Sequence, residues 1–139
     1  MITKSEQGFS LIELLVVMAF IGILLSMGAL TLGRAIEQGR LNEASQTLGE
    51  TLKVISQEAI SSSQEITVTI TSQGLSWLTE SGQSRSLSLP NSATLSSSRS
   101  SFTYSGRGFP IEGAVSFSIK RNEKTRAVNL FATGSVVYP

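Results

Sequence analysis

An uncharged apolar run near the N-terminus constrains this chain more than any other feature of its sequence. The twenty residues from Leu14 to Gly33 contain no charged side chain, and Glu13 is the only charge between Glu6 and Arg34. As an α-helix, such a run would extend over about 30 Å, the thickness of the hydrocarbon core of a bilayer. The sequence therefore predicts a transmembrane helix in this region.

The alternative is a secretory signal peptide that is removed after export. Such a peptide has a basic start, an apolar core of about 7–15 residues and a small-x-small cleavage site. The run here is longer, the leader carries only Lys4 and the amino terminus against Glu6, and no clear cleavage site follows. These features favour a retained anchor.

Glu13 does not suit an ordinary anchor, because an ionised carboxylate inside the apolar region costs several kcal/mol. Residues 8–17 read Gly-Phe-Ser-Leu-Ile-Glu-Leu-Leu-Val-Val. This segment resembles the prepilin signal of the type IV pilin superfamily. The resemblance implies that an aspartic prepilin peptidase cuts between Gly8 and Phe9 at the cytoplasmic face of the inner membrane. It also implies that the new N-terminal residue, Phe9, is then N-methylated.

The same resemblance gives Glu13 a role in assembly, since the family's acidic residue five positions into the mature chain falls on it. The amino group of Phe9 would be a cation at the edge of the apolar region, where a carboxylate attracts it strongly. If that amino group belongs to a neighbouring subunit, both charges are neutralised only on assembly, and Glu13 sets the register of the subunits. The alternative is a Glu13 side chain that snorkels to the membrane interface.

A row of small residues follows one face of the predicted anchor helix. Its members are Gly22, Ser26, Ala29 and Gly33. Small residues at this spacing let helices approach closely in a membrane or a filament core. The alternative is that they merely tolerate lipid.

Beyond Arg34 the helical pattern continues but becomes amphipathic. Apolar residues recur every three or four positions, at Leu41, Ala44, Leu48, Leu52, Ile55 and Ala59. This spacing predicts one long helix whose second half packs on a globular domain. The serines at 61–63 are the expected end of that helix, and Gly39 and Gly49 weaken it.

From Ile66 the apolar period changes from 3.6 to 2, which is typical of half-buried strands. Strands are expected at residues 66–70, 75–77, 87–89, near 95, 102–104, 115–119, 126–132 and 135–138, with a hairpin loop over 121–125. No helical period separates them, so the strands should be antiparallel. The fold class is therefore α+β and pilin-like, with a long N-terminal helix packed on a small antiparallel β-sheet domain.

Four segments follow from these patterns: a leader over 1–8, a transmembrane half-helix over 9–33, an amphipathic half-helix over 34–62 and a β domain over 63–139. The strand order also resembles the minor pilins and pseudopilins of the GspH/FimT-like family. The residues that carry this second resemblance are the strand 66–70 leading to Trp77, the segment 102–108 and the ending 126–130 followed by Gly134.

Composition excludes most catalytic chemistry. The chain contains no Cys and no His, and all ten acidic residues are Glu. Disulfides, thiolate ligands and imidazole bases are therefore absent, so we expect no enzyme activity, no bound metal and no cofactor. The segment Gly106-Arg107-Gly108 lacks the Lys-Ser/Thr of a phosphate loop and is expected to form a turn between strands.

Basic residues crowd one predicted hairpin, which makes it a candidate nucleic-acid contact. They are Lys120, Arg121, Lys124 and Arg126. Such a tip could contact DNA phosphates, whereas the alternative is a solvated hairpin end. DNA-binding members of the resembling family carry paired arginines in a C-terminal tail, and the tail 133–139 has none.

The sequence therefore predicts a non-catalytic minor pilin of a type IV pilus that primes or caps filament assembly. Two alternatives stay open: a minor pseudopilin of a type II secretion system and a DNA-binding subunit of a competence pilus. The resemblance implies other pilins or pseudopilins, the prepilin peptidase and the inner membrane as partners, with DNA as a further candidate. It also implies a single pass through the bacterial inner membrane, with the C-terminal domain outside the cytoplasm.

Overall fold

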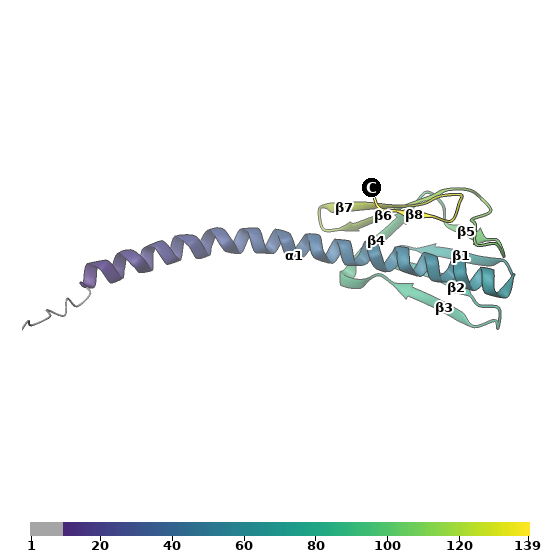
Figure 1. The fold of residues 1–139 in the computed structure, drawn as a ribbon, viewed down its shortest axis with the longest axis horizontal. Coiled ribbons are helices and arrows are strands. Elements are labelled where there is room, and N and C mark those ends of the chain that lie inside the picture. Colours follow the sequence, from purple (N-terminus) through teal and green to yellow (C-terminus); the bar gives the residue numbers. More distant parts are fainter. Residues whose placement is uncertain (1–9) are drawn as a thin grey trace, which may run out of the picture. The chain divides into compact units, whose positions relative to one another are not determined.

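The computed structural model describes residues 10–139, except for the side chains of residues 27–31. A helix, α1 (Leu11–Ser62), comes first in the described part (Figure 1). The strands that follow are β1 (Ile66–Thr71), β2 (Gly74–Leu78), β3 (Ser84–Ser88), β4 (Thr94–Ser97), β5 (Ser101–Tyr104), β6 (Val115–Arg121), β7 (Lys124–Leu130) and β8 (Val136–Val137). A short 3₁₀ turn, η1 (Pro90–Ser92), lies between β3 and β4. The chain divides into two compact units after Glu37.

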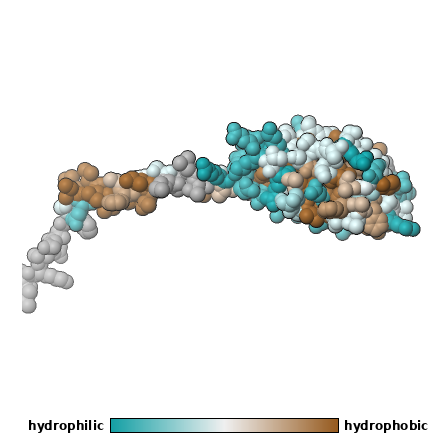
Figure 2. All heavy atoms as spheres, turned by 90° about the horizontal axis from the view of Figure 1, so that it is seen from above, coloured by the Kyte–Doolittle hydropathy of each residue, from teal (hydrophilic) through white to brown (hydrophobic). Residues whose placement is uncertain are grey.

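The first unit contains the start of α1, whose described side chains are exposed and apolar from Leu11 to Leu25 apart from Glu13 (Figure 2). Within the described residues, no helix is both long enough and apolar enough to cross a membrane. The span expected over Leu14–Gly33 includes residues 27–31, whose side chains lie outside that part. The transmembrane segment therefore stays a prediction.

The second unit begins with the amphipathic half of α1. The six apolar positions expected to face a globular domain are all buried, with exposed fractions of 2% or less. Their spacing follows the 3.6-residue period, so they form one stripe along the helix. α1 continues through Gly39 and Gly49 without a break and ends at Ser62, within the serine cluster where its end was expected. The predicted amphipathic helix is confirmed.

The described strands form two four-stranded sheets, in the orders β3-β2-β1-β5 and β4-β6-β7-β8, and every pair is antiparallel (Figure 1). The antiparallel α+β prediction is confirmed. The strands form two sheets because β4 pairs with β6 instead of continuing the ladder of β3. Pro90 lacks an N–H group and the backbone of Asn91 is left-handed (φ 60°), so the ladder ends there and the chain changes sheets.

One cluster of buried side chains joins the second half of α1 to both sheets. The ring of Phe102 on β5 makes edge-to-face contacts with two other rings. Its centroid lies 5.2 Å from that of Tyr104 on the same strand and 6.2 Å from that of Phe117 on β6. These contacts unite the two sheets, and the stripe of α1 supplies apolar surface that such small sheets lack. Burial raises the pKa of the Tyr104 hydroxyl, which has no hydrogen-bond partner in the described part of the chain.

One turn and one strand are shorter than the sequence suggested. The loop expected over 121–125 is a two-residue turn at Asn122 and Glu123, so β6 and β7 extend toward it from both sides. Asn122 has φ 52°, a left-handed conformation that Asn adopts more readily than most residues. The last strand is likewise limited to Val136–Val137, whereas a strand over 135–138 was expected.

Truncation of the helix stripe should destabilise the second unit. Leu52→Ala removes a fully buried side chain from the core, so the free energy of unfolding should fall by about 2–5 kcal/mol. Val54→Ala, on the half-exposed face of the same helix, should cost less than about 1 kcal/mol. Urea unfolding of the detergent-solubilised chain, followed by tryptophan fluorescence, measures both. Equal losses in the two variants would contradict this account of the core.

Candidate assembly site and surfaces of the globular unit

The predicted cleavage site, Gly8 and Phe9, lies outside the described residues. Its processing therefore stays a prediction. The described chain begins one residue later, at Ser10, and Glu13 is in the first turn of α1.

Glu13 and Ser10 form a reciprocal pair at the start of α1. The backbone N–H of Ser10 donates to Glu13 Oε2 over 3.2 Å, and the backbone N–H of Glu13 donates to Ser10 Oγ over 3.3 Å. This arrangement is a capping box, in which two N–H groups without helical partners are satisfied by side chains. It fixes where the helix begins and turns the carboxylate back toward the start of the chain.

The capping box was not foreseen from the sequence, although its signal is present. Ser-x-x-Glu ahead of an apolar run is the pattern that predicts such a box, and residues 10–13 read Ser-Leu-Ile-Glu. The carboxylate of Glu13 thus has a local partner before any neighbouring subunit is considered. This contact does not test the predicted pairing of Glu13 with the amino group of Phe9.

The four basic residues of the predicted nucleic-acid contact do not gather on one face. Lys120 and Arg121 alternate at the end of β6, so their side chains lie on opposite faces, and Lys120 is exposed. Arg121 Nε donates to the carbonyl oxygen of Asn91 over 2.7 Å. Arg126 lies opposite Ile119 in the ladder and donates to Oδ1 of Asn42 on α1. In the register of β6 and β7, Arg121, Lys124 and Arg126 share one face and Lys120 lies on the other. The contact with DNA stays a prediction.

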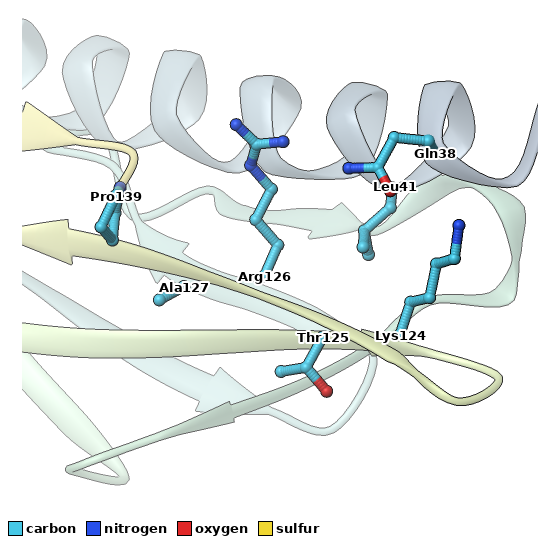
Figure 3. Close-up of a pocket in the computed structure, with 7 residues that line it drawn as sticks. All are labelled: Gln38, Leu41, Lys124, Thr125, Arg126, Ala127 and Pro139. Atoms are coloured by element: carbon cyan, nitrogen blue, oxygen red, sulfur yellow. The ribbon is translucent and has the colours of Figure 1, made fainter. Parts of the chain in front are cut away.

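A groove of about 530 Å³ lies beside Arg126 (Figure 3). Its lining comes from α1, β7 and the C-terminus: Gln38, Leu41, Lys124, Thr125, Arg126, Ala127 and Pro139. The Arg126 side chain points up toward α1, whereas Thr125 points away from the helix (Figure 3). Arg126 Nε is buried without a hydrogen-bond partner among the described residues.

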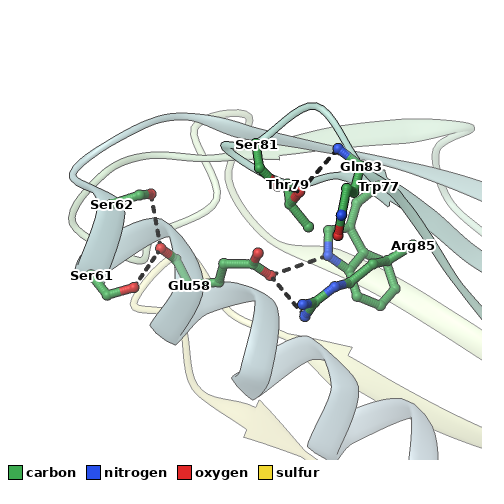
Figure 4. A network of polar contacts seen from close by, with 8 residues as sticks. All are labelled: Glu58, Ser61, Ser62, Trp77, Thr79, Ser81, Gln83 and Arg85. Carbon is green, nitrogen blue, oxygen red and sulfur yellow. Dashed lines mark hydrogen bonds and ion pairs between the residues drawn. The ribbon is translucent and has the colours of Figure 1, made fainter.

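A polar network attaches the end of α1 to the first sheet (Figure 4). The indole N–H of Trp77 donates to Glu58 Oε2 over 3.3 Å, and the guanidinium of Arg85 lies 3.9 Å from the same oxygen. The hydroxyls of Ser61 and Ser62 donate to the Glu58 carbonyl oxygen over 3.0 and 2.9 Å. Glu58 therefore links the helix with β2 and β3, and its role here is structural.

The glycine-rich segment after β5 is a turn, as expected, and its glycines are needed for packing. A Cβ atom on Gly106 would lie 2.7 Å from the carbonyl group of Ser63, and one on Gly108 would lie 2.7 Å from Ile60 and from the Ser56 hydroxyl. That hydroxyl donates to the Gly108 carbonyl oxygen over 2.9 Å. The segment is thus fastened to the end of α1, and no helix N-terminus follows to hold a phosphate.

The C-terminal segment is held down on α1. A Cβ atom on Gly49 would lie 1.9 Å from the Tyr138 hydroxyl, so a larger residue at this position would displace the ring. Burial, with a smaller contribution from Glu50, raises the pKa of Tyr138. In the described part of the chain, no three His, Cys, Asp or Glu side chains are placed to hold a metal ion.

Comparison with known proteins shows which motif and which fold this chain shares with them. Residues 3–29 match the prokaryotic N-terminal methylation motif. The fold matches the type IV minor pilin FimU of Pseudomonas aeruginosa PAO1 with a TM-score of 0.62 at 20% identity, over 74% of this chain and 90% of that one. This chain thus carries the methylation motif and shares the fold of that minor pilin.

A second crystal form of FimU gives a TM-score of 0.58 at 20% identity, over 71% of this chain and 92% of FimU. The minor pseudopilin EpsH from the type 2 secretion system of Vibrio cholerae matches with a TM-score of 0.56 at 15% identity, over 72% of this chain and 96% of EpsH. No curated protein sequence matches this chain. The GspH/FimT-like resemblance thus agrees with both structural neighbours at the level of the fold.

Proposed function

We propose that this chain is a non-catalytic minor subunit of a type IV pilus that primes or caps filament assembly. The observation that carries the proposal is the presence, in one chain, of the N-terminal methylation motif and a fold shared with a minor pilin. The prepilin peptidase cuts between Gly8 and Phe9, and residues 9–33 hold the subunit in the inner membrane until it is extracted. The β domain lies outside the cytoplasm.

The exposed and buried surfaces of the two units support different roles for the two halves of α1. Large apolar side chains from Leu11 to Leu25 are more than 45% exposed, so this part of α1 has apolar surface to bury against lipid or other helices. The stripe from Leu41 to Ala59 is already buried within the second unit. We propose that the first half of the helix assembles the filament and that the second half carries the globular domain.

The experiment is deletion of the gene in its native host, with restoration from a plasmid. We expect far fewer surface filaments in the deletion strain, normal numbers after restoration, and the mature chain in sheared filaments. The likeness to EpsH supports a second candidate, a minor pseudopilin of a type II secretion system. In that case filament number would be unchanged and secretion of exported proteins would fail.

A salt titration tests the third candidate, a DNA-binding subunit of a competence pilus. If Lys120, Arg121 and Lys124 bind phosphates, affinity for duplex DNA should fall with salt by a log–log slope of about −0.9 per contact. A chain with Arg121→Gln and Lys124→Gln should then lose about two units of that slope. We expect weak binding at most, because Arg121 and Arg126 donate to Asn91 and Asn42 within the domain. Tight binding that the double variant abolishes would make DNA uptake the leading candidate function.

A further inference from the structure

Strand β3 is an edge strand whose outer side carries no partner among the described residues (Figure 1). It pairs with β2 along one side only, with Ser86 opposite Ser76 and Arg85 opposite Trp77. Four of its five residues are exposed, and Leu87 is half-buried. The strand is therefore accessible over its whole length.

The direction of its backbone groups follows from the hydrogen bonds at the two ends of the ladder. Thr79 N–H donates to the Gln83 carbonyl over 2.9 Å, and Leu89 N–H donates to the Gln73 carbonyl over 2.8 Å. Bonded and non-bonded pairs alternate in an antiparallel ladder. Arg85 and Leu87 consequently bond to β2, while the N–H and C=O groups of three residues point outward. These residues are Ser84, Ser86 and Ser88.

The other sheet edges of the described chain are covered or short. Beside β5, Pro110 bridges to Tyr104 and Ile111 N–H donates to the Thr103 carbonyl. On the same edge, Thr103 N–H donates to Glu112 over 2.8 Å, which lowers the pKa of that carboxyl. On the free side of β4, the Leu95 N–H donates to the Ser72 carbonyl oxygen over 2.8 Å, and β8 has only two residues.

Edge strands that must stay unpaired usually carry a lysine, a proline, a bulge or an inward charge. β3 has no Lys or Pro, and its ladder with β2 runs through five consecutive pairs without a bulge. Its one charged residue, Arg85, is directed to Glu58 on α1, away from the free edge. The edge therefore lacks a lysine, a proline or a bulge against strand addition, and its one inward charge, Arg85, is paired with Glu58.

We propose that β3 is a strand-addition site for an extended segment of a different pilin-like subunit in the filament. Main-chain bonds to an exposed edge are a common mode of recognition, and the three outward serines supply donors and acceptors for them. This inference rests on the proposed function, which provides such neighbours. The β3 strand of a second copy does not fit, because two antiparallel β3 strands need a two-fold axis that a head-to-tail filament lacks.

Proline substitution tests the site. Ser86→Pro removes an outward N–H group and places a ring on the free edge, a position where an edge strand tolerates proline. The variant should melt within a few degrees of the wild type, yet its recovery in sheared filaments should fall about tenfold or more. Ser86→Ala keeps the N–H group and should be recovered normally. Leu87→Pro removes an N–H group that bonds to β2, so this variant should lower the melting temperature. It serves as the control for proline on the paired side of the strand.

Crosslinking identifies the occupant, because the chain has no cysteine of its own. A photoreactive group attached to Ser84→Cys should join the subunit to another protein that carries a prepilin signal, whereas one attached to the exposed Ser116→Cys on β6 should not. Normal recovery of Ser86→Pro, an adduct with a second copy, or no adduct in intact filaments would overturn the inference and leave the proposed function standing. Absence of the wild-type chain from filaments would instead remove the proposed function, and the inference with it.

Discussion

A chain that carries the substitution Gly8→Leu is expected to keep its first eight residues and to be absent from filaments. In the prepilin resemblance the peptidase cuts after Gly8, and a residue with no side chain lets the enzyme approach the backbone closely. A leucine at this position fills that space, so the leader stays attached and Phe9 never gains a free amino group. Intact-mass spectrometry of membrane protein from the native host measures the result directly. Wild-type protein should be eight residues shorter, with a methyl group on Phe9.

Gly39→Leu is the matched control for this substitution. Gly39 lies within α1, and a Cβ atom there would have no neighbour within 4 Å, so the added side chain causes no clash. The leader of the Gly39→Leu chain should be removed completely. Wild-type protein that begins at Met1, or at a residue beyond Gly33, would contradict the prepilin assignment altogether. Cleavage of the Gly8→Leu variant at the normal rate would show that the peptidase does not require glycine at this position.

The sequence predicted the parts of the fold that depend on local patterns. The stripe from Leu41 to Ala59 was visible because burial on one face of a helix leaves a 3.6-residue period. The strands were visible because β1 and β6 alternate between buried and exposed residues. Each of these patterns is contained within a few turns or one strand, so no knowledge of distant partners was needed.

The pairing of the strands depended on contacts that no local pattern shows. β4 bonds to β6, more than twenty residues later in the chain, and the assignment of β4 to the second sheet follows from that pairing. The side chain of Arg126 was expected at an exposed tip because it is basic and near a turn. It instead bonds to Asn42, which is 84 residues away in sequence. Register and long-range polar partners thus escaped prediction.

Glu13 shows the opposite case, in which a local signal gave one role and concealed another. The prepilin resemblance directed attention to a charge partner in a neighbouring subunit. The structure adds a local partner, Ser10, through the capping box. The two roles make different demands on the side chain, because a cap needs only an oxygen acceptor whereas an ion pair needs a negative charge.

Three substitutions should separate these roles by their effect on assembly. Glu13→Val removes both the acceptor and the charge, and it should leave a stable membrane protein because a buried charge is lost. Its recovery in sheared filaments should fall by more than about tenfold, since a buried ion pair that loses one partner leaves the other uncompensated. Glu13→Gln keeps an oxygen that can accept from Ser10 N–H but carries no charge, so it should fail to nearly the same extent.

Ser10→Ala provides the complementary case, because it removes the hydroxyl that caps Glu13 N–H and keeps the carboxylate. The loss of an N-cap costs about 0.5–2 kcal/mol at the helix start, so this variant should assemble with a moderate reduction. Immunoblots of sheared filaments, normalised to the membrane-bound pool and to Phe9 methylation, measure all three variants together. A Glu13→Gln chain that enters filaments normally would show that Glu13 acts as a helix cap alone. In that case the amino group of Phe9 would need a different carboxylate, or none, in the assembled filament.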